Sequence, residues 1–309
     1  IMTGAPMPPG ADAVVMVERT AAVGDDRVRV EVTVEPGNDV RRAGDDLVAG
    51  DEVFGAGTSL TPAHLGVLAS IGATEVEVGR RPRVGVVSTG DELVAPGAAL
   101  GPGQIRDSNR VALLAALAEL GVEPVDLGLI ADDEDRIRDA LTAGISSCDA
   151  LCTSGGVSMG DFDYVKTALD DVADMRWMQV AIKPAKPFAF GVAGAVPVFG
   201  LPGNPVSSLV SFELFARPAL RRMMGHRDLE RLHVLAEAVD GLPRRSDGKT
   251  HFVRVALERD GRGFVARSAG GQGSHQMRAM ADADGLAILR DGPGIEPGGS
   301  VTVMVLTRF

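Results

Sequence analysis

The chain has 309 residues, of which 45% are hydrophobic, and this is enough for two or three domains with their own cores. Because only 4% of the residues are aromatic, these cores must be largely aliphatic. Its 31 basic and 42 acidic residues give a formal charge of −11. This balance excludes a general nucleic-acid or anionic-membrane surface, which would need a basic face, and leaves only a local basic pocket open. No apolar run is long enough to span a membrane.

The two cysteines, Cys148 and Cys152, have neither the redox CxxC spacing nor a zinc pattern. We therefore expect two core thiols in the reducing environment of the cytoplasm. The chain starts at Ile1, without an initiator methionine, and we expect it to be the interior of a longer protein.

The first 81 residues begin with a β-rich pattern. Strands are expected at 13–18 and 27–34, separated by the turn-prone residues 24–26. A helix is expected to begin after Thr61, with Pro62 at its first position and Gly72 beyond its end.

From residue 83 to about 225, strand-like and helix-like segments alternate, which predicts a mostly parallel sheet covered on both faces. The strands are expected at 84–87, 125–130, 150–153, 178–182, 187–192 and 198–201. Between them we expect helices capped by Asp107 or Ser108 and by Asp132, a helix after the 154–160 loop, and a long helix from Pro205. Beyond residue 225, short strands at 233–239, 252–257, 263–267, 286–289 and 301–306 predict a small antiparallel barrel or sandwich.

Three loops follow apolar runs and carry groups that could hold an anion or a metal: residues 154–166, 183–187 and 200–205. Loops at the carboxyl ends of strands line the ligand crevice of an open α/β sheet, so we expect these loops to meet in one place. The candidate anion-binding groups of the first and last loops are Ser154, Gly155, Gly156, Ser158, Pro202, Gly203, Asn204, Pro205 and Ser207. An ordinary strand–helix turn and a simple Asn-Pro helix cap are the alternatives.

Only four residues of the chain are lysines, namely Lys166, Lys183, Lys186 and Lys249, and three of them fall in those loops. Lys183 and Lys186 alternate with prolines, which stiffen the segment, so the pair could hold a small tetrahedral oxyanion. A solvated surface strip is the alternative, although the flanking residues are strongly apolar.

Acidic residues at loops and helix starts are the other half of the pattern: Asp46, Asp91, Glu92, Asp132, Asp161 and Asp163. Carboxylates facing phosphates would repel them unless Mg²⁺ lies between, so this set indicates magnesium-assisted phosphate chemistry. Helix capping is the alternative, and for Asp132 alone it is preferred. Arg254 and the glycine-rich segment 270–275 also stand out, although that segment could be only a hairpin.

Seven motifs in this order resemble the molybdopterin molybdenumtransferase family, which includes MoeA and the gephyrin E domain: residues 1–6, 42–46, 88–93, 103–107, 154–160, 183–187 and 201–205. The resemblance implies a partial β-rich domain at 1–45, the remainder of an elongated linker domain at 46–81, a molybdopterin-binding α/β domain at 82–228 and a C-terminal β-barrel at 229–309. It implies a transferase that inserts molybdate into adenylylated molybdopterin, with Mg²⁺-dependent release of AMP.

The resemblance also assigns roles to individual residues. Acids tied to Mg²⁺ and catalysis are matched by Asp46, Glu92, Asp132 and Asp163, with the last three as metal ligands. Residues that hold molybdate are matched by Lys183, Lys186, Arg254 and Ser274. Thr3 matches a substrate-site residue of the second domain, and Pro202 and Pro205 match prolines beside the pterin pocket. Gln179 departs from the pattern, because some members carry a lysine there.

Family members are homodimers whose sites are completed across the subunit interface, and an adenylyltransferase acts before them. Two rival interpretations stay open at this point. One is a molybdopterin adenylyltransferase or nucleotide pyrophosphatase of the same fold, and the other is a non-catalytic scaffold of the gephyrin type.

Overall fold

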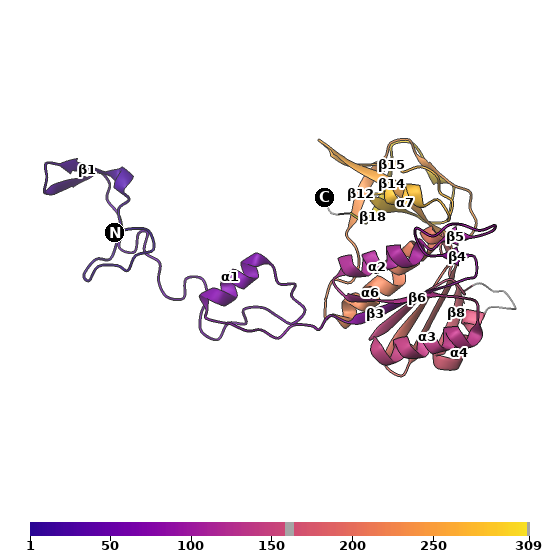
Figure 1. Ribbon diagram of the computed structural model, residues 1–309. Coiled ribbons are helices and arrows are strands. Elements are labelled where there is room, and N and C mark those ends of the chain that lie inside the picture. Colours follow the sequence, from indigo (N-terminus) through magenta and orange to yellow (C-terminus); the bar gives the residue numbers. More distant parts are fainter. Residues whose placement is uncertain (158–163, 308–309) are drawn as a thin grey trace. The chain divides into compact units, whose positions relative to one another are not determined.

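The computed structural model describes residues 1–157 and 164–307, so three predicted site residues, Ser158, Asp161 and Asp163, lie outside the described part. The chain divides into two compact units, Ile1–Thr58 and Ser59–Phe309 (Figure 1). Each unit is described by itself.

The first unit contains one short β-hairpin. β1 (Thr20–Val23) pairs antiparallel with β2 (Arg27–Val30), and a 3₁₀ turn at Val17–Arg19 precedes it. The strand expected at 13–18 is therefore wrong, and the one expected at 27–34 ends early. The reason is the register: Val23 pairs with Arg27 across residues 24–26, so the partner strand must directly precede this turn.

The second unit opens with α1 (Pro62–Ser70), as predicted. The Thr61 N–H donates to His64 Nδ1 at 3.2 Å, and Pro62 occupies the first turn, where its missing N–H costs nothing.

A six-stranded sheet forms the centre of this unit, in the order β6-β3-β7-β11-β10-β8. The strands are β3 (Arg83–Thr89), β6 (Glu123–Ile130), β7 (Ala150–Ser154), β8 (Asp174–Gln179), β10 (Pro187–Ala193) and β11 (Val196–Leu201). The first four in the sheet order are parallel and the last two pairings are antiparallel, which confirms the mostly parallel sheet. β8 ends at Gln179, so the strand expected at 178–182 is wrong.

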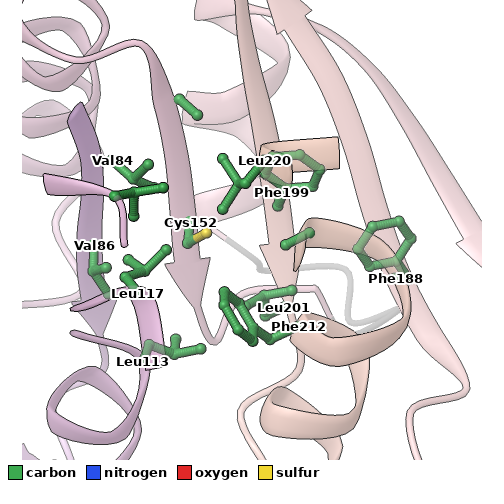
Figure 2. Packing of buried hydrophobic residues seen from close by; sticks show 13 residues of the cluster. Val84, Val86, Leu113, Leu117, Cys152, Phe188, Phe199, Leu201, Phe212 and Leu220 are labelled. Atoms are coloured by element: carbon green, nitrogen blue, oxygen red, sulfur yellow. The ribbon is translucent and has the colours of Figure 1, made fainter. Parts of the chain in front are cut away.

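Helices cover both faces of the sheet. α2 (Asn109–Leu120), α5 (Pro205–Ser211), a π-helical turn (Phe212–Ala216) and α6 (Arg217–Met223) cover one face, and α3 (Glu134–Ser147) and α4 (Tyr164–Val172) cover the other. Figure 2 shows the first core, in which Leu113, Leu117 and Leu220 pack with strand residues such as Val84. This core is mainly aliphatic, as the composition predicts, although Phe188, Phe199 and Phe212 also belong to it.

Helix capping differs from the prediction at α3. The cap is Asp133, whose Oδ1 accepts the Arg136 N–H at 2.9 Å, and Asp132 is instead bonded to Asp91. At α2, the Asp107 carboxylate accepts the Arg110 N–H at 3.1 Å, while Ser108 makes no capping bond.

The C-terminal part is a closed barrel. Its strands are β12 (His233–Ala238), β14 (Thr250–Asp260), β15 (Gly263–Ser268), β16 (Gly285–Leu289) and β18 (Gly299–Val305), and the β14–β15 pairing closes it. The barrel is not fully antiparallel as predicted, because β12 and β15 run parallel. In a closed barrel with an odd number of strands, the neighbouring pairs cannot all be antiparallel. One pair of these five strands is therefore parallel. Smaller elements are α7 (Met277–Ala281) and the two-residue strands β4 (Leu93–Val94), β5 (Ile105–Arg106), β9 (Ile182–Lys183), β13 (Leu242–Pro243) and β17 (Gly294–Ile295).

Both cysteines are buried free thiols, as predicted. Burial raises the pKa of the Cys152 thiol to about 12. Among the described residues, no helix combines the length and apolarity needed to cross a membrane.

Candidate functional site

The loops after β7 and β11 meet at the carboxyl edge of the sheet. The Gly155 N–H donates to Leu201 O at 3.1 Å, and a Cβ placed on Gly203 would lie 3.7 Å from the Gly155 Cα. Asn109, at the start of α2, joins the loops: its Nδ2 donates to Ser154 Oγ at 2.8 Å and to Gly203 O at 2.7 Å. The predicted meeting of these two loops is confirmed.

Glycine is required in the first of these loops by the fold itself. Gly155 and Gly156 have φ angles of 98° and 67°, which side chains rarely adopt. A Cβ on Gly156 would lie 2.1 Å from the Cβ of Val165 in α4. The positive φ angles and the close contact with Val165 therefore explain both glycines.

Two aspartates lie side by side at the ends of β3 and β6. The Asp132 N–H donates to Asp91 Oδ1 at 3.0 Å, and the Asp91 N–H donates to Asp132 Oδ2 at 3.3 Å. The Glu92 carboxylate folds back over Gly90, since a Cβ there would lie 2.5 Å from Glu92 Oε2. Within the described ranges, no three acidic, histidine or cysteine groups gather as a metal cluster.

That pair is compatible with magnesium, because this ion is usually bound through one or two carboxylates together with water and substrate phosphates. Asp91 and Asp132 supply two carboxylates at the edge where the glycine loops end. Asp91 is a candidate ligand to which the family resemblance assigned no role, and the position of Asp163 is outside the described residues.

A cleft of about 890 Å³ lies between the 183–187 segment and the barrel. The segment is fixed there because β9 pairs in parallel with β14, Ile182 opposite Thr250 and Lys183 opposite His251. Four predicted residues line the cleft: Lys183, Lys186, Ser207 and Ser274. In the described part of the chain, neither of these two lysines has an ion-pair or hydrogen-bond partner for its ammonium group.

Arg254 lies beneath the wall of the cleft and is fully buried. Its Nη2 donates to Gly271 O at 2.6 Å and to Gly273 O at 3.1 Å, while Nε and Nη1 have no partner among the described residues. Burial lowers the pKa of this guanidinium. Ser274 O accepts the Val206 N–H at 3.0 Å, so the loop that Arg254 supports also contacts the first turn of α5.

Helix α5 connects the loop after β11 to the cleft. Gly203 and Asn204 precede this helix, and Ser207 in its first turn lines the cleft. Pro205 is at the first helical position, as predicted. Asn204 is the N-cap residue, but its side chain makes no capping hydrogen bond. Neither Glu92 nor Gly155 lines the cleft in the described structure.

Comparison with known proteins places the whole chain in one family. Family models match residues 1–72 (MoeA N-terminal region, domain I and II), 85–222 (probable molybdopterin binding domain) and 241–306 (MoeA C-terminal region, domain IV). The molybdopterin molybdenumtransferase of Haemophilus influenzae is 39% identical over 306 residues, which cover 98% of this chain and 76% of that protein. The chain belongs to the molybdopterin molybdenumtransferase family.

Two further relatives agree. Molybdopterin molybdenumtransferase 2 of Mycobacterium tuberculosis is 41% identical over 295 residues, covering 93% of this chain and 71% of that protein. A crystal structure of the molybdopterin biosynthesis MoeA protein from Pyrococcus horikoshii OT3 has a TM-score of 0.81 at 27% identity and covers 99% of this chain and 74% of that chain. This member of the molybdopterin molybdenumtransferase family is thus a transferase of molybdenum cofactor biosynthesis, and the resemblance read from the motifs is confirmed.

Two other predicted site residues of this molybdenumtransferase-family chain, Thr3 and Asp46, are exposed residues of the first unit. Lys166, expected in the first loop, is instead in α4, with its Nζ 5.5 Å from the centroid of the Trp177 ring.

The sequence reasoning missed Asn109, because at the start of a helix it is typical of a cap. It also missed the barrel residues that line the cleft, among them Arg245 and Lys249. The only available signal was that Lys249 is one of four lysines in the chain.

Proposed function

We propose that this chain inserts molybdate into adenylylated molybdopterin and releases AMP, with Lys183 and Lys186 binding the oxyanion. The observation that carries the proposal is the cleft, in which two ammonium groups are exposed on a segment anchored to β14 and have no partner among the described residues. Family membership supplies the reaction class, and the cleft supplies a place for the metal oxyanion.

The electrostatics of the cleft favour a dianion such as molybdate. The two ammonium groups, which are unpaired within the described part of the chain, lie on one short segment and repel each other. A bound dianion between them removes that repulsion. Ser207 and Ser274 add hydroxyl groups to the same lining. Arg254 acts behind them, because its bonds to Gly271 and Gly273 hold the loop that leads into Ser274.

The pterin and phosphate part of the substrate is proposed to lie at the edge of the sheet. Backbone groups of the Ser154–Gly156 turn and of Pro202–Pro205 are held together there by Asn109. Gly203 leaves space, since the contact a Cβ would make is an ordinary 3.7 Å. A planar ring and a phosphate could therefore approach the backbone closely.

Asp91 and Asp132, with Glu92 beside them, are proposed to hold Mg²⁺ against the phosphates, and Asp163 is proposed to join them. Bound there, the ion would neutralise charge on the phosphates as AMP departs. The carboxylates of Asp91 and Asp132 are already oriented, because each accepts the other's backbone N–H.

We propose that the protein is a cytoplasmic homodimer, with Thr3 and Asp46 completing the site across the subunit interface. The substrate would be supplied by an adenylyltransferase that activates molybdopterin, because the proposed reaction consumes an adenylylated compound.

The proposal is tested by single-turnover assays of the protein with adenylylated molybdopterin, molybdate and Mg²⁺, measuring both AMP and molybdenum cofactor. Lys183→Ala and Lys186→Ala should each lower cofactor formation at limiting molybdate by about tenfold or more. Arg262→Ala, in an exposed barrel turn, removes the same charge outside the cleft and serves as the matched control. AMP release without molybdate-dependent cofactor, or lysine variants that behave like the control, would contradict the proposal.

A further inference from the structure

Three of the four lysines of this chain line one cleft. Lys183 and Lys186 come from the segment that joins the sheet to the barrel, and Lys249 comes from the barrel itself. Arg245 lines the same cleft from the barrel loop 244–249. In a chain with a net charge of −11, this concentration of cations on two facing elements needs an explanation.

The barrel loop is held rigidly in place. The Arg244 side chain is only 2% exposed; its Nη1 donates to Lys249 O at 2.8 Å and to Leu289 O at 3.0 Å. Its Nη2 donates to Asp247 Oδ1 and Asp291 Oδ1, both at 2.8 Å. The backbone that carries Arg245 and Lys249 is therefore fixed before any ligand arrives, which lowers the entropic cost of binding.

Asp247 is the one carboxylate among the described lining residues, and it already has partners. Asp247 accepts from Arg244 and lies 3.1 Å from His251 Nε2, so its charge is largely compensated. Lys249 forms an ion pair with Asp247, but its Nζ lies 3.8 Å from Asp247 Oδ2, which is too long for a hydrogen bond and leaves the ammonium hydrogens free to donate to a ligand. Arg245 has no side-chain partner in the described part of the chain. Both side chains can therefore turn to a ligand.

The size and charge of the cleft exceed what an oxyanion needs. A volume of about 890 Å³ is in the range of sites for cofactor-sized molecules, whereas molybdate has only five heavy atoms. The proposed reaction also has to bring molybdate next to the sulfur atoms that receive it. Those thiolates are anionic, so they repel the oxyanion unless further positive charge offsets them.

We infer that Lys249 and Arg245 form a second cationic wall that binds the anionic dithiolene end of the pterin substrate, opposite the oxyanion held by Lys183 and Lys186. This inference rests on the proposed function of the cleft. It assigns the two walls to two different anions, one inorganic and one organic, and it explains why the barrel contributes to the site.

The test measures two affinities separately. Molybdate binding is followed by calorimetry and molybdopterin binding by pterin fluorescence, in the wild type, Lys249→Ala, Arg245→Ala, Lys183→Ala and the Arg262→Ala control. We expect Lys249→Ala and Arg245→Ala to raise the Kd for molybdopterin about tenfold while changing that for molybdate less than twofold. Lys183→Ala should show the reverse pattern, and Lys249→Arg should recover most of the molybdopterin affinity.

Unchanged molybdopterin affinity in both barrel variants, with unaltered unfolding temperatures, would overturn the inference while leaving the oxyanion site standing. A loss of molybdate affinity in place of molybdopterin affinity would also overturn it. If Lys183→Ala leaves molybdate binding unchanged, the proposed function of the cleft fails instead, so the two failures are distinguishable.

Discussion

Asn109 is a residue whose removal should damage both the fold and the site. Its two amide hydrogens bond Ser154 Oγ at 2.8 Å and Gly203 O at 2.7 Å, and Ser154 is only 3% exposed. A net hydrogen bond contributes about 0.5–1.5 kcal/mol, so Asn109→Ala should cost about 1–3 kcal/mol of unfolding free energy. The two loops would also lose the link that sets their separation.

The variant is assayed by urea unfolding and by molybdopterin binding. A loss of about 2 kcal/mol corresponds to a midpoint shift of about 1 M urea. Ser108→Ala is the matched control, because this exposed neighbour makes no capping bond. The molybdopterin Kd should rise several-fold in Asn109→Ala alone. If Asn109→Ala unfolds and binds like Ser108→Ala, the link between the loops is not what orders the site.

Three further predictions concern the fold. Leu117→Ala, at a fully buried position of the first core, should destabilise the protein by about 2–5 kcal/mol in the same urea assay, and a cost below 1 kcal/mol would contradict the packing. Cys152 should resist iodoacetamide at pH 8 until the protein is unfolded, because burial raises its pKa to about 12; rapid labelling of the native protein would contradict this. The two hydrogen bonds from the Arg80 guanidinium, at 2.6 and 2.7 Å, lower the pKa of the Asp149 carboxyl. The ion pair therefore stabilises the folded protein fully above pH 3.8, the ordinary pKa of an aspartate, and this stabilisation is lost as the pH falls through the lowered pKa of the folded state. Asp149→Asn should therefore destabilise the protein at pH 7 by about 1 kcal/mol, and the difference from wild type should vanish in acid; a difference independent of pH would contradict the ion pair.

Local sequence patterns predicted the parts of the fold that depend on local chemistry. The alternation of strand-like and helix-like segments correctly predicted a mostly parallel sheet, and α1 begins where Thr61 and Pro62 predict. The strand expected at 13–18 failed because strand formation depends on a partner, and register is decided by the turn at 24–26. The parallel pairing of β12 with β15 also depends on barrel closure, which no local pattern encodes.

The residues of the candidate site likewise fall into those that local motifs could predict and those that depend on long-range contacts. The motifs identified the glycine turn and the two lysines of the 183–187 segment because proline and glycine mark constrained backbone. They could not identify Lys249, which reaches the cleft only because β9 pairs with β14. The paired residues Lys183 and His251 are 68 positions apart in the chain. Asn109 was equally hidden, since its partners lie at the ends of two other strands.

The oxyanion site is tested most directly by a crystal of the protein soaked in molybdate, with anomalous diffraction used to locate the metal. We predict one strong molybdenum peak between the Lys183 and Lys186 ammonium groups, close enough for both to donate hydrogen bonds to the oxyanion. Ser274 should lie on the same side of the cleft. A peak confined to the glycine turn near Gly155, or a cleft that stays empty at saturating molybdate, would contradict the assignment.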